Sequence, residues 1–249
     1  MGRRRRRSRR FRSLKLAAAI FAVSVAASAA QERSDNMLEK LHWLGHASFR
    51  LDGPKAIYFD PWKLAKDAKK ADIIFVTHDH FDHLSVDDIK RITTKETIII
   101  ADSSSAKQIK GKVDAKEIKA MSPGDSVEID GIKVSAVPSY NTNKTFHPKA
   151  EKKVGYIVTV GGISIYHAGD TDFIPEMKDI KCGITLLPVS GTYVMTSTEA
   201  AEAALTIKPK IAIPMHYGDI VGSDRDAEAF REALKGKVEV RILKHDKQE

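Results

Sequence analysis

The 249 residues of the sequence include one cysteine, Cys182. A single thiol cannot form a disulfide within the chain, so disulfide bonds cannot hold this fold together. Because Cys182 precedes an apolar segment, we expect it to fill space in the core rather than to act as a nucleophile. The chain is long enough to build a substantial hydrophobic core, which must supply the stability instead.

The sequence also lacks an excess of positive charge outside its N-terminus. Nine of the 41 lysines and arginines lie in residues 1–29, which contain no acidic residue. The rest of the chain contains 32 lysines and arginines and 33 aspartates and glutamates. A nearly neutral body argues against the electrostatic binding that nucleic acids require, so we expect no nucleic-acid partner.

The N-terminal apolar run, residues 16–27, is too short to span a bilayer comfortably. It follows an arginine-rich stretch and precedes small residues, an order typical of an export signal. Ser8-Arg9-Arg10-Phe11 also resembles a twin-arginine signal, although the phenylalanine comes one position early. We expect residues 1–30 to direct export to the periplasm or beyond, with membrane contact only during export. The alternatives are an uncleaved anchor and a basic tail.

Residues 31–37 are predicted to be a linker, and residues 38–249 a single domain. Continuous apolar runs predict buried strands, and Asp130-Gly131 and Gly161-Gly162 predict two hairpins. The predicted strands are Lys40–Leu44, Ser48–Leu51, Ala56–Asp60, Asp72–Thr77, Thr97–Ala101, Ser126–Ile129, Ile132–Val137, Val154–Val160, Ile163–Tyr166, Ile184–Leu187, Lys210–Pro214 and Val238–Leu243. The predicted helices begin at Ser85, Ser103, Thr198 and Asp224. Hairpins in both halves, interleaved with helices, favour an α/β fold in which two packed sheets have helices outside.

Histidines are concentrated in one short segment that directly follows a predicted buried strand. Residues 78–83, His-Asp-His-Phe-Asp-His, contain three of the nine histidines and two aspartates. Imidazole and carboxylate groups together suit zinc, iron and related divalent ions. His78 and His80 can converge on one ion, while Asp82 and His83 can reach a second. We expect Asp79 not to bind a metal but either to face outward or to contact a ligand residue.

This segment resembles the signature of the metallo-β-lactamase superfamily. Two later segments match in order: residues 166–171, Tyr-His-Ala-Gly-Asp-Thr, and residues 213–217, Ile-Pro-Met-His-Tyr. Residues 43–48 and 59–61 add a resemblance to the branch that contains ascorbate-6-phosphate-lactonase-like hydrolases. The resemblance implies an αββα four-layer sandwich, made of two mixed β-sheets flanked by helices.

The resemblance also implies roles for the matching residues. His78 and His80 would bind the first metal, and Asp170 would bridge it to the second. Asp82, His83 and His216 would complete the second site. We expect two divalent ions, zinc first, with manganese or iron as alternatives.

The sequence departs from the family pattern at one ligand of the first metal. Many members have a histidine just after the strand that corresponds to residues 132–137, where this chain has Asn141. We expect His147, six residues later, to act as the third ligand instead. Ligation by Asn141, or a position open to water or substrate, is the alternative.

The chemistry implied is hydrolysis of an ester, lactone or phosphodiester bond in a small molecule by a metal-bound hydroxide. Asp82 is the candidate to orient or deprotonate the attacking water. His46 and Asp60 match positions beside the metals, where hydrogen bonds orient ligands, and His46 is also a candidate to touch substrate. Tyr193 is a candidate donor to a developing oxyanion.

Other functions remain as alternatives. The departure at Asn141 would suit a non-catalytic module that holds metal for binding or sensing. Di-iron relatives that reduce oxygen typically place a glutamate where His80 stands, and true β-lactamases generally lack the aspartate seen at Asp170. We therefore favour the hydrolase over both of these relatives.

Overall fold

The computed structural model describes residues 32–246, so the predicted export signal at residues 1–30 lies outside the described residues. Residues 32–39 form a helix, although residues 31–37 were predicted to be a linker. This segment contains no glycine or proline to interrupt a helix, which is a sufficient reason for the difference. The chain divides into two compact units between Glu39 and Lys40, and the second contains both sheets.

The first sheet is mixed and has six strands in chain order. The strands are β1 (Leu41–Gly45), β2 (Ser48–Leu51), β3 (Ile57–Phe59), β4 (Ile73–Val76), β5 (Ile98–Asp102) and β6 (Glu117–Met121). The first three strands pair antiparallel, and β3 to β6 pair parallel. Parallel pairing brings the carboxyl ends of β3 to β6 to the same edge of the sheet, where the loops after them meet.

The second sheet is also mixed and has seven strands. Their order across the sheet is β13 (Glu239–Val240), β12 (Ile211–Met215), β11 (Ile184–Pro188), β10 (Ile163–His167), β9 (Val154–Val160), β8 (Ile132–Pro138) and β7 (Ser126–Ile129). The predicted hairpins β7–β8 and β9–β10 are present, and β10 to β13 pair parallel. The segments that follow β10 and β12 therefore leave the same edge of this sheet.

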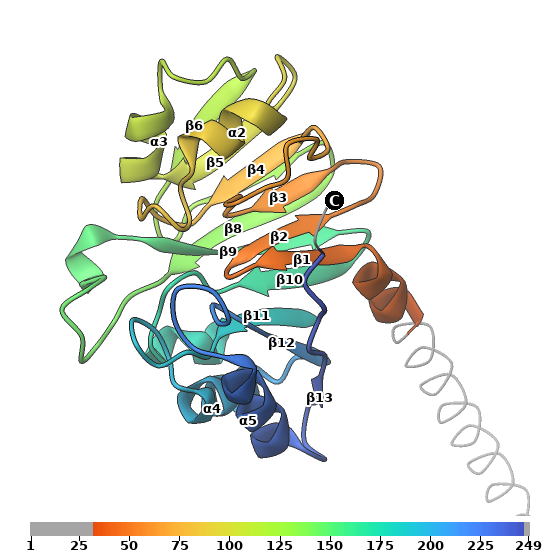
Figure 1. The fold of residues 1–249 in the computed structure, drawn as a ribbon, viewed down its shortest axis with the longest axis vertical. Helices are drawn as coiled ribbons and strands as arrows, with labels where there is room; N and C mark the ends of the chain where they lie inside the picture. Colours follow the sequence, from red (N-terminus) through yellow and green to blue (C-terminus); the bar gives the residue numbers. More distant parts are fainter. Residues whose placement is uncertain (1–31, 247–249) are drawn as a thin grey trace, which may run out of the picture. The chain divides into compact units, whose positions relative to one another are not determined.

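Helices cover the outer faces of the two sheets (Figure 1), which confirms the predicted αββα sandwich. The helices α2 (Val86–Ile92) and α3 (Ser103–Ile109) lie on the first sheet, and α4 (Ser197–Ile207) and α5 (Asp224–Leu234) lie on the second. Two short 3-10 helices, η1 (Lys149–Glu151) and η2 (Pro175–Asp179), were not predicted. Helix α4 begins with a capping box formed by Thr196 and Glu199.

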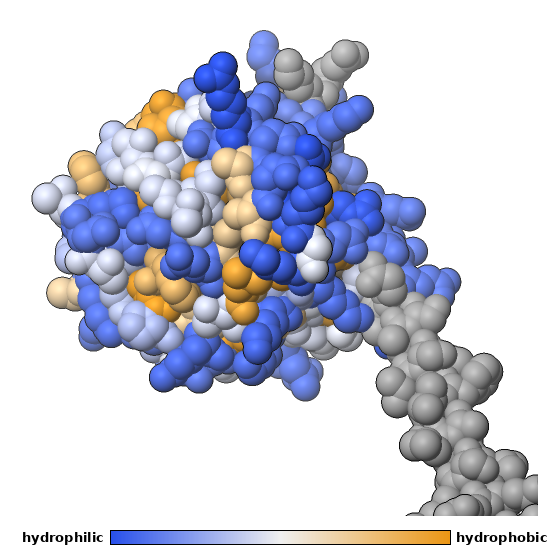
Figure 2. Space-filling view, turned by 90° about the horizontal axis from the view of Figure 1, so that it is seen from below, coloured by the Kyte–Doolittle hydropathy of each residue, from blue (hydrophilic) through white to orange (hydrophobic). Residues whose placement is uncertain are grey.

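The central strands are buried because helices or the other sheet cover both of their faces. Every residue of β4, β11 and β12 is buried, as their continuous apolar sequences predicted. Under α2 and α3, side chains such as Ile74, Ile89 and Ile109 form one apolar cluster. The molecular face seen in Figure 2 is mostly hydrophilic, with hydrophobic residues in small separate patches.

Two elements differ from the prediction. Strand β6 was missed because it lies at the edge of its sheet, where Glu117 and Ala120 are exposed and the apolar signal is weak. The last strand was predicted as Val238–Leu243, but β13 is only two residues long. Within residues 32–246, no helix combines the length and the apolar character needed to cross a membrane.

Gly155 in β9 lies against the end of β10, and we expect Gly155→Ala to destabilise the protein. A Cβ atom there would lie 2.7 Å from the carbonyl oxygen of His167 and 2.8 Å from that of Ala168. Backbone must move to make room, so we expect a loss of about 1–3 kcal/mol in the free energy of unfolding, measured with denaturant. Gly53→Ala is the matched control, because its nearest neighbour would be 3.7 Å away. Equal stability of the two variants would contradict the close packing.

Candidate metal centre

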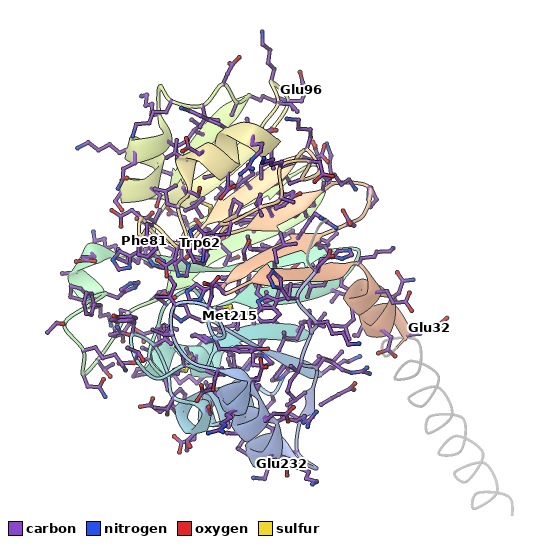
Figure 3. The ribbon with its side chains drawn as sticks, in the orientation of Figure 1. Glu32, Trp62, Phe81, Glu96, Met215 and Glu232 are labelled. Atoms are coloured by element: carbon purple, nitrogen blue, oxygen red, sulfur yellow. The ribbon has the colours of Figure 1, made fainter. Side chains whose placement is uncertain are left out.

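The predicted site residues come together between the two sheets. Four of them follow β4 directly, and the others come from loops after β1, β8, β10 and β12. In Figure 3, Phe81 and Trp62 are labelled side by side in this region, and Met215, the residue before His216, is labelled close to them. The residues that meet here are His46, His78, His80, Asp82, His83, His147, Asp170 and His216.

The first group contains His78, His80, His147 and Asp170. One potential ligand atom from each lies within 4.8 Å of the others. The Nδ1 atom of His80 is 3.0 Å from the Nε2 atom of His147, and the Nε2 atom of His78 is 3.9 Å from the Oδ2 atom of Asp170. Three imidazoles and one carboxylate at these distances form a donor set that fits a divalent transition metal.

The second group contains His46, Asp82, His83 and His216, again with ligand atoms within 4.8 Å of one another. Asp170 lies beside this group too. Its Oδ1 atom is 3.2 Å from the Nε2 atom of His83, and its Oδ2 atom is 3.1 Å from the Nε2 atom of His216. The carboxylate of Asp170 therefore lies between the two groups, in position to contact an ion in each.

Several buried polar atoms of the two groups have no hydrogen-bond partner. They are the Nε2 atoms of His78, His83 and His216, the Oδ1 atom of Asp170, the Nδ1 atom of His46 and the Nδ1 atom of His147. Leaving buried donors or acceptors unsatisfied costs about 1–3 kcal/mol each. The first four of these atoms lie where metal ions would contact them, so the donor set fits two cations.

The histidines of the first group are neutral at pH 7. Burial lowers the pKa of His78 well below its ordinary value, and the neighbouring His83 lowers it further. Burial also lowers the pKa of His147 to about 4. Burial and the nearby Lys153 ammonium lower the pKa of His80. Neutral imidazole is the form that binds metal, so protons do not compete for these three side chains.

At Asp170 and His83, opposite charges outweigh burial. Burial alone would raise the pKa of Asp170, but His216 and His83 hold it well below its ordinary value. Burial would likewise lower the pKa of His83, but Asp170 and Asp60 raise it well above the ordinary value. Asp170 is therefore ionised, and a metal ion would replace the charge that a protonated His83 supplies.

Asp60, predicted to orient ligands, forms hydrogen bonds with Thr77 and His83. Its Oδ2 atom accepts hydrogen bonds from the Nδ1 atom of His83 at 2.7 Å and from the Thr77 hydroxyl at 2.7 Å. Because Thr77 gives its proton to Asp60, its oxygen accepts the hydrogen bond from the Nδ1 atom of His78, at 2.9 Å. These hydrogen bonds hold the Nδ1 atoms of both histidines, so the Nε2 atom of each faces the centre, where a metal ion would take the place of a proton.

The backbone is held in an unusual conformation at this centre. Among the described residues, eight other than glycine have positive φ angles. Four of these belong to the site: His46 at 50°, Asp60 at 42°, His147 at 56° and His216 at 61°. Residues other than glycine rarely adopt positive φ angles. Such backbone strain is concentrated where function requires a particular side-chain direction.

The loop between β8 and β9 places His147 in the first group. The backbone N–H of Asn141 donates to the carbonyl oxygen of His147 at 2.8 Å. The amide Nδ2 atom of Asn141 donates to the carbonyl oxygens of Phe146, at 3.0 Å, and Tyr193, at 2.8 Å. Asn141 thus closes the loop that carries His147. The imidazole of His147 faces His78 and His80, whereas the amide nitrogen of Asn141 faces backbone carbonyl oxygens.

The other predicted residues lie around the centre. The Nε2 atom of His46 donates to the Oδ2 atom of Asp82 at 3.0 Å. The pKa of Asp82, which burial would raise, is lowered by this hydrogen bond, so Asp82 is ionised. Tyr193 lines the cavity beside the metal groups and is partly exposed. Asp79 pairs with Lys153 at 2.8 Å, outside both groups, as expected.

Three residues without a predicted role also contact the site. Thr77 links Asp60 to His78, and the hydroxyl of Ser190 lies 3.1 Å from the Nδ1 atom of His216. The ring of Trp62 packs on His46 with centroids 5.5 Å apart. Thr77 directly precedes the histidine motif, which was a usable signal, whereas nothing in the sequence pattern marked Ser190 or Trp62.

A cavity of about 250 Å³ opens onto the two groups. Its lining combines residues of the metal groups with apolar side chains from four loops. These residues are His80, Phe81, Asp82, Phe146, His147, Asp170, Tyr193, His216, Ile220 and Val221. A small molecule in this cavity would therefore contact both candidate metal positions.

Asp60→Asn tests whether the orientation of His83 and His78 matters. An amide cannot accept the same set of hydrogen bonds, so we expect metal affinity to fall about 10–100-fold, as when the outer partner of a ligand is lost. Competition with a coloured zinc chelator measures this affinity. Asp67→Asn, at an exposed position, is the control and should bind metal normally. Unchanged affinity in Asp60→Asn would contradict the orienting role.

Comparison with known proteins places these features in a family. The family described as "Beta-lactamase superfamily domain" matches residues 40–216 of this chain. A UPF0173 metal-dependent hydrolase from Archaeoglobus fulgidus is 34% identical over 224 residues, covering 82% of this chain and 96% of that relative. Another from Methanosarcina mazei is 33% identical over 220 residues, covering 82% and 94%.

Solved structures show the same similarity. The crystal structure of a candidate metal-dependent hydrolase from Parabacteroides distasonis is 38% identical, with a TM-score of 0.73 over 82% of this chain and 93% of that chain. Igni18, a metallo hydrolase from Ignicoccus hospitalis, is 24% identical, with a TM-score of 0.66 over 82% and 94%. The second comparison supports the fold alone.

Proposed function

We propose that this chain, which belongs to the beta-lactamase superfamily and is a metal-dependent hydrolase, uses two metal ions to cut ester, lactone or phosphodiester bonds in small molecules. The proposal rests on the position of Asp170, whose carboxylate oxygens lie within 4.0 Å of histidine nitrogen atoms from both groups. A carboxylate between two cations holds both and shares their charge.

When bound, divalent ions lower the pKa of water to about 7 and so supply a nucleophile at neutral pH. In this proposal His78, His80 and His147 hold one ion, Asp82, His83 and His216 hold the other, and Asp170 touches both. Zinc is the first candidate, because histidine and aspartate ligands suit it, although manganese and iron accept the same set.

Asp82 orients the attacking water in this proposal. Its carboxylate lines the cavity and is ionised, so it can accept a hydrogen bond or a proton from water. His46 donates to the Oδ2 atom of Asp82 and holds the carboxylate in place from the buried side. Tyr193 lines the same cavity, where its hydroxyl is the candidate donor to an oxygen that gains negative charge.

The direct test combines metal analysis with hydrolysis assays. We expect purified protein, kept away from chelators, to contain two transition-metal ions per chain and to hydrolyse aryl esters, lactones or bis(p-nitrophenyl) phosphate. A chelator should remove both the metal and the activity, and metal addition should restore them. Two bound ions without turnover of any of these substrates would favour the non-catalytic binding or sensor module instead.

We also propose that the enzyme acts outside the cytoplasm. The support is the order of charge, apolar run and small residues in residues 1–30. Cell fractionation should find the protein outside the cytoplasm, shortened by about 30 residues at its N-terminus, as a cleaved signal requires. Arg9→Lys with Arg10→Lys should block export if the twin-arginine route is used. Full-length protein in the cytoplasm would contradict the proposal.

A further inference from the structure

Exposed apolar side chains are concentrated at the mouth of the cavity. Among residues 32–246, the large apolar side chains exposed to solvent are Phe81, Phe146, Tyr193, Leu205 and Ile220. All except Leu205, which lies on α4, line the cavity beside the metal groups. Exposed apolar surface is costly in water, and a concentration of it beside a site usually marks where a ligand binds.

These side chains come from separate loops and surround the opening. We call Phe81, Phe146, Tyr193, Ile220 and Val221 the apolar rim. The rings of Phe146 and Tyr193 meet edge to face with centroids 5.1 Å apart. Phe81, which is 68% exposed, leaves most of its ring free to cover a ligand.

The carboxylates that line the cavity, Asp82 and Asp170, belong to the metal groups, so they do not leave a charge free to bind a charged substituent. Among the described residues, neither lysine nor arginine contributes to the lining of the cavity. Three lysines on nearby loops are paired with aspartates: Lys63 with Asp219, Lys144 with Asp172, and Lys153 with Asp79. A charged group on the substrate, away from the metal ions, would therefore lose water without gaining a partner.

The size of the cavity limits the substrate as well. Its volume of about 250 Å³ lies just below the roughly 300–1,000 Å³ typical of pockets for drug-sized ligands. A short acyl chain or a single aromatic ring fits such a space, whereas a polymer would have to extend over the rim into solvent. The carbonyl next to that group would then lie at the metal centre.

We infer that the substrate is a small uncharged ester or lactone whose apolar acyl or aryl group is held by the apolar rim. This inference rests on the proposed function, because it concerns the same cavity. It also separates this chain from ascorbate-6-phosphate lactonases, the branch suggested by the sequence. A phosphorylated sugar lactone would place a charged group against Phe146 and Ile220, with no cation there to bind it.

A matched pair of substrates tests the inference in the metal-loaded protein. p-Nitrophenyl hexanoate and the mono-p-nitrophenyl ester of adipic acid have the same leaving group and six-carbon acyl groups, but the second carries a terminal carboxylate. We expect kcat/KM to be at least about tenfold higher for the hexanoate than for the adipate or for the acetate, because each buried methylene contributes to binding.

Two rim variants, from separate loops, identify the surface responsible. Phe146→Ser and Ile220→Ser should each lower the ratio of kcat/KM for hexanoate over acetate about tenfold, while both metal ions remain bound. Leu205→Ser is the matched control, because it removes an exposed apolar side chain outside the cavity, and should leave the ratio unchanged. Calorimetry should show tighter binding of hexanoate, the product, than of adipate.

The outcomes separate this inference from the proposed function. Equal use of hexanoate and adipate, or a ratio that neither rim variant changes, would overturn the inference while leaving a hydrolase. Rim variants that lose binding to phosphatidylcholine vesicles but keep the ratio would overturn it in favour of a membrane-contact surface. If protein with two bound ions hydrolyses only a phosphodiester, the inference fails, and if it hydrolyses no ester, lactone or phosphodiester, the proposed function fails. The calorimetric comparison of hexanoate with adipate would then still show whether the apolar rim prefers apolar groups.

Discussion

Asp170→Asn is expected to lower kcat/KM for ester hydrolysis about a thousandfold or more and to reduce the bound metal below two ions per chain. The substitution keeps the size of the side chain but removes the negative charge that lies between the two groups. Metal ions stabilise a transition state by several kcal/mol, and each 1.36 kcal/mol is a factor of ten in rate. Metal analysis and steady-state kinetics on the same preparation measure both effects.

The control for this variant lies two residues further along the chain. Asp172 is equally buried, but it pairs with Lys144 and accepts hydrogen bonds from Thr142 rather than facing the histidines. Asp172→Asn should therefore keep both metal ions, even if its stability falls. Normal turnover by Asp170→Asn, or equal loss of metal from both variants, would show that Asp170 does not join the two groups.

The buried strands and the metal-binding segment could be predicted because their signals are local. Strand β4 is a continuous apolar run, and three histidines lie within the seven residues that follow it. The hairpin β7–β8 follows from one Asp-Gly turn. In contrast, β6 was missed because an exposed edge strand needs no continuous apolar sequence. The sandwich itself was confirmed, although its assignment depended on resemblance as well as on pattern.

The remainder of the site depends on contacts between distant segments, which no local pattern encodes. Asp170 and His216 were found only through the family resemblance, since a single aspartate or histidine after a strand has no distinctive spacing. Thr77 and Ser190 were missed because their roles arise from hydrogen bonds formed only in the folded chain. The apolar rim was not predicted either: Ile220 lies in a loop that no sequence pattern connected to the site.

The total charge of the chain is a property of its sequence, whereas the pairing of charges depends on the fold. The nearly neutral charge of residues 30–249 was predictable, because charged residues can be counted. This count did not show that Lys63, Lys144 and Lys153 are each paired with an aspartate. This pairing leaves the mouth of the cavity apolar, although 30% of the residues in the chain are charged. The selection of uncharged substrates inferred above would therefore depend on the positions of charges rather than on their number.

His147→Ala should remove one of the two metal ions and lower kcat/KM by at least a hundredfold. His147 is the third imidazole of the first group, and its Nε2 atom lies 3.0 Å from the Nδ1 atom of His80. Losing a direct ligand should cost more than the roughly 10–100-fold in metal affinity that follows loss of an outer partner. Titration of zinc into metal-free protein counts the remaining sites, and His42→Ala, outside both groups, is the control.

Asn141→Asp decides between His147 and Asn141 as the ligand, because the two possibilities predict opposite changes in the affinity for the first metal ion. If Asn141 bound the first metal, a carboxylate in its place would bind more tightly. In the structure, its amide donates to the carbonyl oxygens of Phe146 and Tyr193, which a carboxylate would repel. We therefore expect Asn141→Asp to loosen the loop that carries His147 and to weaken binding of the first ion. Tighter binding in Asn141→Asp, together with full occupancy in His147→Ala, would transfer the ligand role to Asn141.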